Sequence, residues 1–89
     1  MRDIVFKNRF HRDLQRMLKR SKDGEKLLAI ARKLAADIPL PQSARLHKLS
    51  GEYAGWWECH VESDWLLIYR VTQNEVLLYR TGTHADLFE

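Results

Sequence analysis

Three of the four histidines, His47, His60 and His84, lie in the second half of the chain, and Asp64 stands just before Trp65. Histidine is the common side chain whose ordinary pKa lies near neutrality, so several histidines beside one carboxylate can offer both a proton acceptor and a proton donor at pH 7. Each histidine taken singly also fits an ordinary surface or hydrogen-bonded residue. Together they suggest a site for general acid–base chemistry.

The same residues also suit a metal site, because histidine and aspartate are ligands of zinc and of nuclease metals. The spacing gives this alternative little support, since the sequence has no compact H-x-x-x-H pair and the histidines come from three segments. We therefore expect no metal and no other cofactor. His11, beside Phe10, has no comparable partners, and the lone Cys59 is expected to be a buried small hydrophobe rather than a nucleophile.

Two helices and a set of strands must position these side chains. Residues 3–7 have the pattern of a short strand, and apolar spacing predicts one helix from an N-cap at Asn8 to near residue 21 and a second over 27–38, which prolines end. A short β-like segment at 46–51 is followed by three longer ones, 55–62, 65–71 and 76–82. The sequence predicts an α+β fold in the order β-α-α-β-β-β, with an antiparallel sheet packed against an N-terminal helical hairpin.

The segment 55–62 has two faces of different character. Trp57, Cys59 and Val61 alternate with Trp56 and a polar set, Glu58, His60 and Glu62, so one face is expected in the core and the other to carry His60. Adjacent Trp56 and Trp57 cannot both point inward, so one of them is exposed or lies over a site. An exposed aromatic near Lys or Arg suits stacking on unpaired RNA bases.

Length and composition indicate one domain, residues 1–89, in a protein with 45% hydrophobic and 30% charged residues. No segment resembles a membrane span or a signal peptide, so a cytoplasmic location is expected. Charge is uneven: residues 1–48 carry 13 Lys/Arg and 5 Asp/Glu, whereas residues 49–89 carry 2 and 7, so that +8 and −5 give the net +3. The first half therefore suggests a basic surface for a polyanion or an acidic partner, although solvated helix faces explain the same pattern.

The second half closely resembles the YafQ branch of the RelE/ParE toxin superfamily, the ribosome-dependent mRNA endonucleases of bacterial toxin–antitoxin pairs. The resemblance is carried by the H-x-L-x-G segment that begins at His47, by the string CHVESDWLLIY, and by the ending RTGTH-x-x-LF. It extends over nearly the whole chain and implies the fold described above. Ser63 departs from the pattern, because relatives often have proline there; serine fixes that turn less firmly.

Carried over residue by residue, the resemblance implies four catalytic residues: His47, His60, Asp64 and His84. It also implies that Trp65 and Phe88 support the site, and Arg80 is a candidate for binding phosphate. The implied reaction is metal-independent: the ribose 2′-OH attacks its adjacent phosphate and leaves a 2′,3′-cyclic phosphate and a 5′-OH. Our hypothesis has His84 as the general acid and either His60 or Asp64 as the base.

The resemblance gives the basic helices a role as a ribosome-binding surface that contacts rRNA phosphates. The residues expected there are Arg9, Arg12, Arg16, Lys19, Arg20, Arg32 and Lys33. It also implies an mRNA substrate and a cognate antitoxin protein as partners. Two alternatives remain open: a non-enzymatic toxin of the same fold that acts on another target such as gyrase, and a metal-dependent nuclease.

Overall fold

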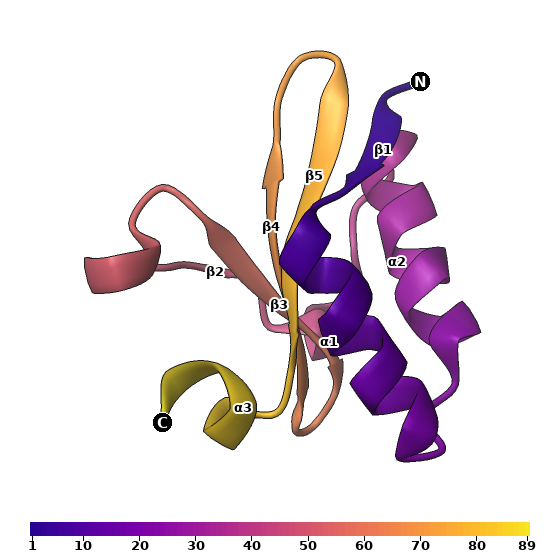
Figure 1. The fold of residues 1–89 in the computed structure, drawn as a ribbon. Coiled ribbons are helices and arrows are strands. Elements are labelled where there is room, and N and C mark those ends of the chain that lie inside the picture. Colours follow the sequence, from indigo (N-terminus) through magenta and orange to yellow (C-terminus); the bar gives the residue numbers. More distant parts are fainter.

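The computed structural model describes residues 1–89 and consists of a five-stranded sheet with two long helices packed on one face (Figure 1). The strands, in the spatial order β1-β5-β4-β3-β2, are β1 (Asp3–Phe6), β5 (Glu75–Gly82), β4 (Trp65–Val71), β3 (Trp57–Glu62) and β2 (His47–Lys48). The helices are α1 (Asn8–Lys19), α2 (Gly24–Ala35) and the short C-terminal α3 (His84–Phe88). None of the helices has the length and apolar character that crossing a membrane requires.

The α+β fold predicted from the sequence is confirmed, with one correction to the sheet. Strands β2 to β5 pair with their neighbours in antiparallel fashion, as expected. Strand β1 instead pairs with β5 in parallel, with Asp3 opposite Glu75 and Phe6 opposite Leu78, so the sheet is mixed. A parallel neighbour requires a long connection, and the helical hairpin and the other three strands provide it.

The central strand β4 is buried on both faces. Trp65, Leu67 and Tyr69 belong to the main core beneath the helices, which has Phe10, Met17, Leu27 and Ala31 among its other members. Leu66 and Ile68 alternate with them and lie in a second cluster on the opposite side of the sheet, together with Tyr53 and Leu87. This second cluster fixes α3 against the sheet and so determines where the chain following β5 is placed.

A bulge in β3 changes the direction of one predicted polar residue. His60 lies opposite Leu66, whereas Glu62, two residues later, lies opposite Trp65, only one residue away. The register of β3 against β4 therefore shifts between His60 and Glu62. Glu62 binds Lys22 and Lys26, each at 2.9 Å, so its side chain lies on the side of the sheet that carries the helices. The alternation had placed Glu62 on the same face as His60, and that prediction is wrong.

Cys59 lies in the main core as predicted, and burial raises the pKa of its thiol to about 12. One of the adjacent tryptophans is exposed, as predicted, but it is Trp57, which the alternation had placed on the core face with Cys59. Trp57 is 40% exposed. Trp56 stacks on Tyr79 at 4.4 Å between ring centroids and carries the Arg70 guanidinium at 4.2 Å from its own ring centroid, so neighbours already occupy its faces.

Helix ends were located less well than helix interiors. Lys7, not the predicted Asn8, occupies the N-cap position of α1, and no side chain caps that end. The sequence pattern gave no sign of α3, which a reciprocal capping box stabilises: Thr83 accepts from the main-chain N–H of Asp86, while the Asp86 carboxylate accepts from that of Thr83.

Candidate active site

Asp64 and His84 form the best-defined polar contact among the predicted catalytic residues. Asp64 lies in the turn between β3 and β4, and His84 is the first residue of α3. One oxygen, Asp64 Oδ1, lies 2.8 Å from His84 Nδ1 and accepts the main-chain N–H of His84 at 3.0 Å. These two bonds, the main-chain bond first, hold the pKa of Asp64 below its ordinary value. Asp64 is therefore a carboxylate at neutral pH, and it leaves His84 Nε2 free in an exposed ring.

His60 approaches the same place from β3. Its Nδ1 lies 3.1 Å from the carbonyl oxygen of Ser63, so a proton on Nδ1 is donated to that oxygen and Nε2 stays available in the neutral ring. The ring centroids of His60 and His84 are 6.0 Å apart. Sheet pairing and the start of α3 thus bring together two imidazoles, each of which has one ring nitrogen already engaged.

Aromatic side chains border His84. Phe88, one turn further along α3, has its ring centroid 6.1 Å from that of His84 and is 45% exposed, which agrees with its predicted place beside the site. Tyr53, which sequence reasoning missed, meets Phe88 edge to face at 5.6 Å. The Tyr53 hydroxyl donates a hydrogen bond to the carbonyl oxygen of Leu87 at 3.3 Å, so Tyr53 holds α3 in place.

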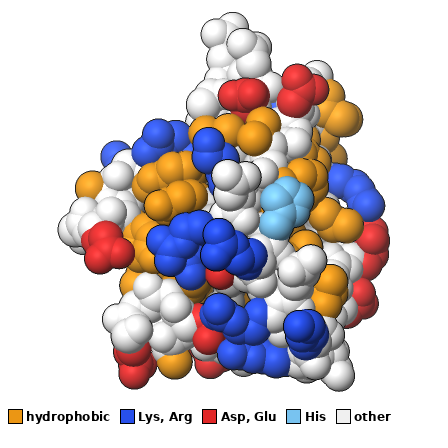
Figure 2. Space-filling view, viewed as in Figure 1, with side chains coloured by type: hydrophobic (Ala, Val, Ile, Leu, Met, Phe, Trp, Pro, Cys, Tyr) orange, Lys and Arg blue, Asp and Glu red, His pale blue; other side chains and the backbone are white.

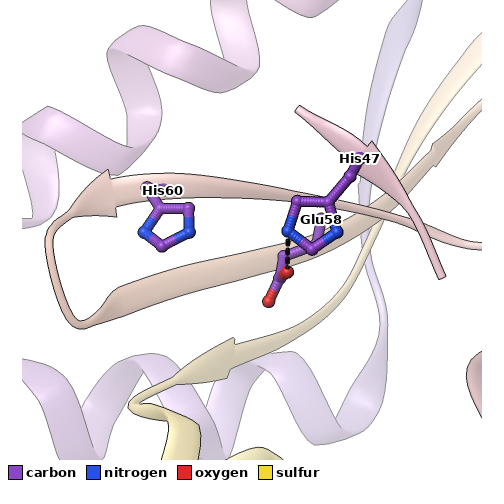
Figure 3. Close-up of side chains that lie close together, drawn as sticks. All are labelled: His47, Glu58 and His60. Carbon is purple, nitrogen blue, oxygen red and sulfur yellow. Dashed lines mark ion pairs between the residues drawn. The ribbon is translucent and has the colours of Figure 1, made fainter. Parts of the chain in front are cut away.

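His47 is paired with a buried carboxylate that the sequence reasoning did not select. His47 on β2 lies opposite Glu58 on β3, and its Nε2 is 2.6 Å from Glu58 Oε2 (Figure 3). Glu58 is 2% exposed. Glu58 stands two residues before His60, so both side chains lie on one face of β3. This alternation is the feature of the sequence that could have identified Glu58 as a site residue. Ligand atoms of His47, Glu58 and His60 all lie within 4.8 Å of one another.

Trp65 and Arg80, which were expected to support the site, are both buried. Trp65 is fully buried and donates from Nε1 to Thr81 Oγ1 at 2.8 Å, so it can fix the turn that carries Asp64 but cannot touch a substrate. Arg80, expected to bind phosphate, is 6% exposed. Its guanidinium donates two hydrogen bonds to the carboxylate of Asp13 on α1, from Nε to Oδ2 at 2.6 Å and from Nη2 to Oδ1 at 3.2 Å. The guanidinium expected to bind phosphate is therefore occupied by a buried aspartate in this structure.

The seven predicted ribosome-binding residues are all exposed, and Lys and Arg side chains gather on the face over α1 (Figure 2). Three of them are engaged with carboxylates. Arg20 binds Asp86 at 2.7 Å, Arg16 lies 3.7 Å from the same carboxylate, and Arg32 pairs with Glu25. The Arg20 contact is the largest cause that holds the pKa of Asp86 well below its usual range. The remaining four, which have no carboxylate within 4.0 Å, are Arg9, Arg12, Lys19 and Lys33.

A mixed sheet with a helical hairpin on one face and a histidine–carboxylate site beside its C-terminal helix defines a toxin of the RelE-like fold. The family model "Bacterial toxin of type II toxin-antitoxin system, YafQ" matches residues 2–89, and the chain belongs to this YafQ toxin family.

Named relatives agree over nearly the full length. The mRNA interferase toxin YafQ of Escherichia coli K12 is 40% identical over 88 residues, which are 98% of this chain and 96% of the relative. The E. coli DinJ–YafQ complex contains a chain of 39% identity and TM-score 0.89, with both chains covered completely. A metal-bound toxin from Helicobacter pylori is 32% identical with a TM-score of 0.91, covering 99% of this chain and 100% of that one. The family and enzyme class predicted from the sequence, an endoribonuclease toxin, agree with these matches.

Proposed function

We propose that this protein is an mRNA interferase, a toxin that cleaves translated mRNA on the ribosome with its own acid and base groups and is neutralised by a cognate antitoxin. The observation that carries the proposal is the contact of 2.8 Å between Asp64 and His84, with the ring of His60 centred 6.0 Å from that of His84. A pair of separately held imidazoles meets the need of phosphodiester transfer for one proton acceptor and one proton donor.

In the proposed reaction, neutral His60 takes the proton of a ribose 2′-OH through Nε2. The 2′ oxygen then forms a bond to the adjacent phosphorus while the bond from phosphorus to the 5′ oxygen breaks. Protonated His84 gives its Nε2 proton to that leaving oxygen, so the products are a 2′,3′-cyclic phosphate and a 5′-OH. Asp64 is assigned to hold His84 and not to act as the base, because two N–H groups occupy it and its pKa is lowered.

The remaining site residues have supporting roles in this proposal. When protonated, His47 supplies positive charge near the phosphate from a position fixed by Glu58, a role that Arg80 cannot fill while it is bound to Asp13. Phe88, half-exposed beside His84, offers a face on which a nucleobase can stack.

The proposed partners are the ribosome, mRNA and an antitoxin. The C-terminal end of α1 lies next to α3, since Arg16 and the C-cap residue Arg20 reach Asp86, so the exposed cations of this helix lie on an element that adjoins the site. Such cations suit RNA phosphates in a sequence-independent way. The complex of the E. coli relative with DinJ supports the proposal that this chain has an antitoxin of its own.

Primer extension on an mRNA with purified translating ribosomes tests the proposal. We expect defined cuts with the protein, none without ribosomes, and a loss of about 10²- to 10⁴-fold in rate for His84→Ala, since this is the usual contribution of a proton-transfer group. His11→Ala, a change of an exposed histidine on α1, is the matched control and should cut normally. Uncut mRNA with folded protein contradicts the proposal, and products ending in 3′-OH contradict the cyclic-phosphate route.

A further inference from the structure

Helix α3 carries both His84 and Phe88, yet it is too short to be stable by itself. It has five residues, and isolated helices shorter than about 12 residues are marginal in water. Its order must therefore come from contacts with the rest of the protein. At the N-terminal end these are the capping box of Thr83 and Asp86 and the bonds from His84 to Asp64. The C-terminal end, where Phe88 lies, depends on other residues.

One hydroxyl group connects the C-terminal end of α3 to the buried part of the protein. Tyr53 ends a short 3₁₀ turn, Gly51–Tyr53, and is 8% exposed. Its hydroxyl donates to the carbonyl oxygen of Leu87 and accepts from Arg80 Nη1, both at 3.3 Å. A guanidinium can only donate, so this arrangement leaves the hydroxyl proton for Leu87. Asp13 accepts from Arg80 Nε at 2.6 Å, which fixes the guanidinium that orients Tyr53.

The ring of Tyr53 also supports the ring of Phe88. The two centroids are 5.6 Å apart and the ring planes meet at 82°, which is an edge-to-face pair. The ring of Tyr79 supports Tyr53 in turn, at 6.2 Å and 73°. Phe88 is 45% exposed and lines, together with Tyr53, a hollow of about 380 Å³. An aromatic ring that is already held in one orientation loses less conformational freedom when a base stacks on it, so these contacts favour stacking.

We propose that Tyr53 is a positioning residue of the active site: its hydroxyl, oriented by Arg80, fixes the last turn of α3 so that Phe88 presents its ring to a nucleobase beside the scissile phosphate. This role rests on the proposed function, because that function supplies the nucleobase. Tyr53 is buried, so it acts through Phe88 and does not touch the reacting atoms. Asp64 holds His84 at the opposite end of α3, so the proton donor keeps its own contacts when the Tyr53 hydroxyl is removed.

The order of α3 can be measured by NMR without RNA. Tyr53→Phe keeps the ring and removes only the hydroxyl. We expect the ¹⁵N order parameters of Leu87 and Phe88 to fall from about 0.85, the value of rigid backbone, toward about 0.6, while those of β4 stay unchanged. Tyr79→Phe is the matched control, because the hydroxyl that it removes from the same cluster has no hydrogen-bond partner in the protein. In that variant α3 should stay as ordered as in the parent protein.

Two NMR results overturn the proposal. The first is unchanged order at Leu87 and Phe88 in Tyr53→Phe. The second is an equal loss of order along β4, because the hydroxyl would then stabilise the whole fold and not the last turn of α3.

Cleavage of mRNA on ribosomes tests whether this order matters for the reaction. We expect Tyr53→Phe to lower kcat by about ten-fold or more, since a displacement of about 1 Å can cost about a hundred-fold. KM for the translating ribosome and the pH dependence of cleavage should stay as in the parent protein, because the cations of α1 and the contact between Asp64 and His84 are kept. Tyr79→Phe should cut normally. A rate for Tyr53→Phe equal to that of the parent protein overturns the positioning role.

A double-mutant cycle with Phe88→Leu identifies the route of the effect. If Tyr53 acts through Phe88, its hydroxyl has no ring left to position in Phe88→Leu. The double variant should therefore cut no more slowly than Phe88→Leu alone. Losses that multiply in the double variant overturn the proposal, because an effect on the folded fraction would act independently of Phe88.

The two measurements fail in different ways. A parent protein that never cuts mRNA contradicts the proposed function and with it the role of Tyr53 in cleavage, while the order parameters still show whether Tyr53 fixes α3. A parent protein that cuts, together with a Tyr53→Phe variant that cuts equally well, contradicts only the positioning role.

Discussion

The carboxylate of Asp64 joins the turn between β3 and β4 to the first turn of α3 by accepting both from the ring and from the main chain of His84. A carboxylate at a helix N-terminus is stabilised by the free N–H groups there, and the imidazole adds a second donor. The geometry of the site thus depends on a contact between residues twenty positions apart.

The first prediction concerns the titration of Asp64. Both bonds stabilise the charged form, so its pKa lies below the ordinary value in the folded protein. His84→Ala removes the imidazole but keeps the main-chain N–H, which is the larger cause, so we expect the pKa of Asp64 to rise and still stay below the ordinary value. NMR titration of the side-chain carboxyl carbon measures this. An ordinary pKa already in the parent protein contradicts the contact.

The second prediction concerns acid stability through Asp86, which pairs with Arg20 and belongs to the capping box of α3. Its pKa is lower in the folded than in the unfolded chain, so its stabilising contribution is fully present above about pH 5 and is lost progressively as pH falls below about 4. Asp86→Asn should lower the free energy of unfolding by about 1–2 kcal/mol at pH 7 and by much less near pH 2.

Urea denaturation at several pH values measures this difference. Asp37→Asn is the matched control, because Asp37 is 87% exposed and lies 3.4 Å from Arg2, an arrangement that contributes little. We expect the control to change the free energy of unfolding by less than about 0.5 kcal/mol at every pH. A difference for Asp86→Asn that stays constant from pH 7 to pH 2 shows that its charge is not the cause.

The parts of the fold that could be predicted are those encoded by local periodicity. The 3.6-residue spacing of Phe10 and Met17 located α1, and alternation along 55–62 separated Cys59 from His60. Pairings between distant segments have no such local signal. The parallel partner of β1 is an example: its strand pattern contains nothing that selects β5 over another edge.

The motif predicted which residues come together, but it could not predict which polar side chains are buried. His60, Asp64, His84 and Phe88 do converge. Alternation places Glu58 on a polar face, but it does not distinguish a solvated carboxylate from the buried one that pairs with His47 of β2. Arg80 was a candidate for binding phosphate, and nothing in the sequence near it indicates its partner, because Asp13 lies on α1, sixty-seven positions earlier.

The third prediction tests that buried pair. Arg80→Leu leaves Asp13 with the main-chain N–H of Thr81 as its remaining donor, at 3.2 Å, and an uncompensated charge in a buried site. Loss of one partner of a buried ion pair typically costs about 3–5 kcal/mol, so we expect a large fall in the free energy of unfolding. Arg12→Leu, a change of an exposed arginine on the same helix as Asp13, should cost less than about 0.5 kcal/mol. Thermal and urea denaturation compare the two, and equal small effects contradict a stabilising role.

The last prediction concerns the proposed ribosome-binding surface. Arg9 and Arg12 are exposed and have no carboxylate within 4.0 Å, so they are available to RNA phosphates. Arg9→Glu with Arg12→Glu should greatly reduce cosedimentation with ribosomes. The slope of the logarithm of the binding constant against the logarithm of salt concentration should become less steep by about 0.9 for each phosphate that is no longer bound. The melting temperature should stay unchanged within a few degrees. Arg45→Glu with Lys48→Glu changes the net charge equally on exposed residues outside the helices. Equal loss in both variants indicates that overall charge, and not a surface on α1, governs the association.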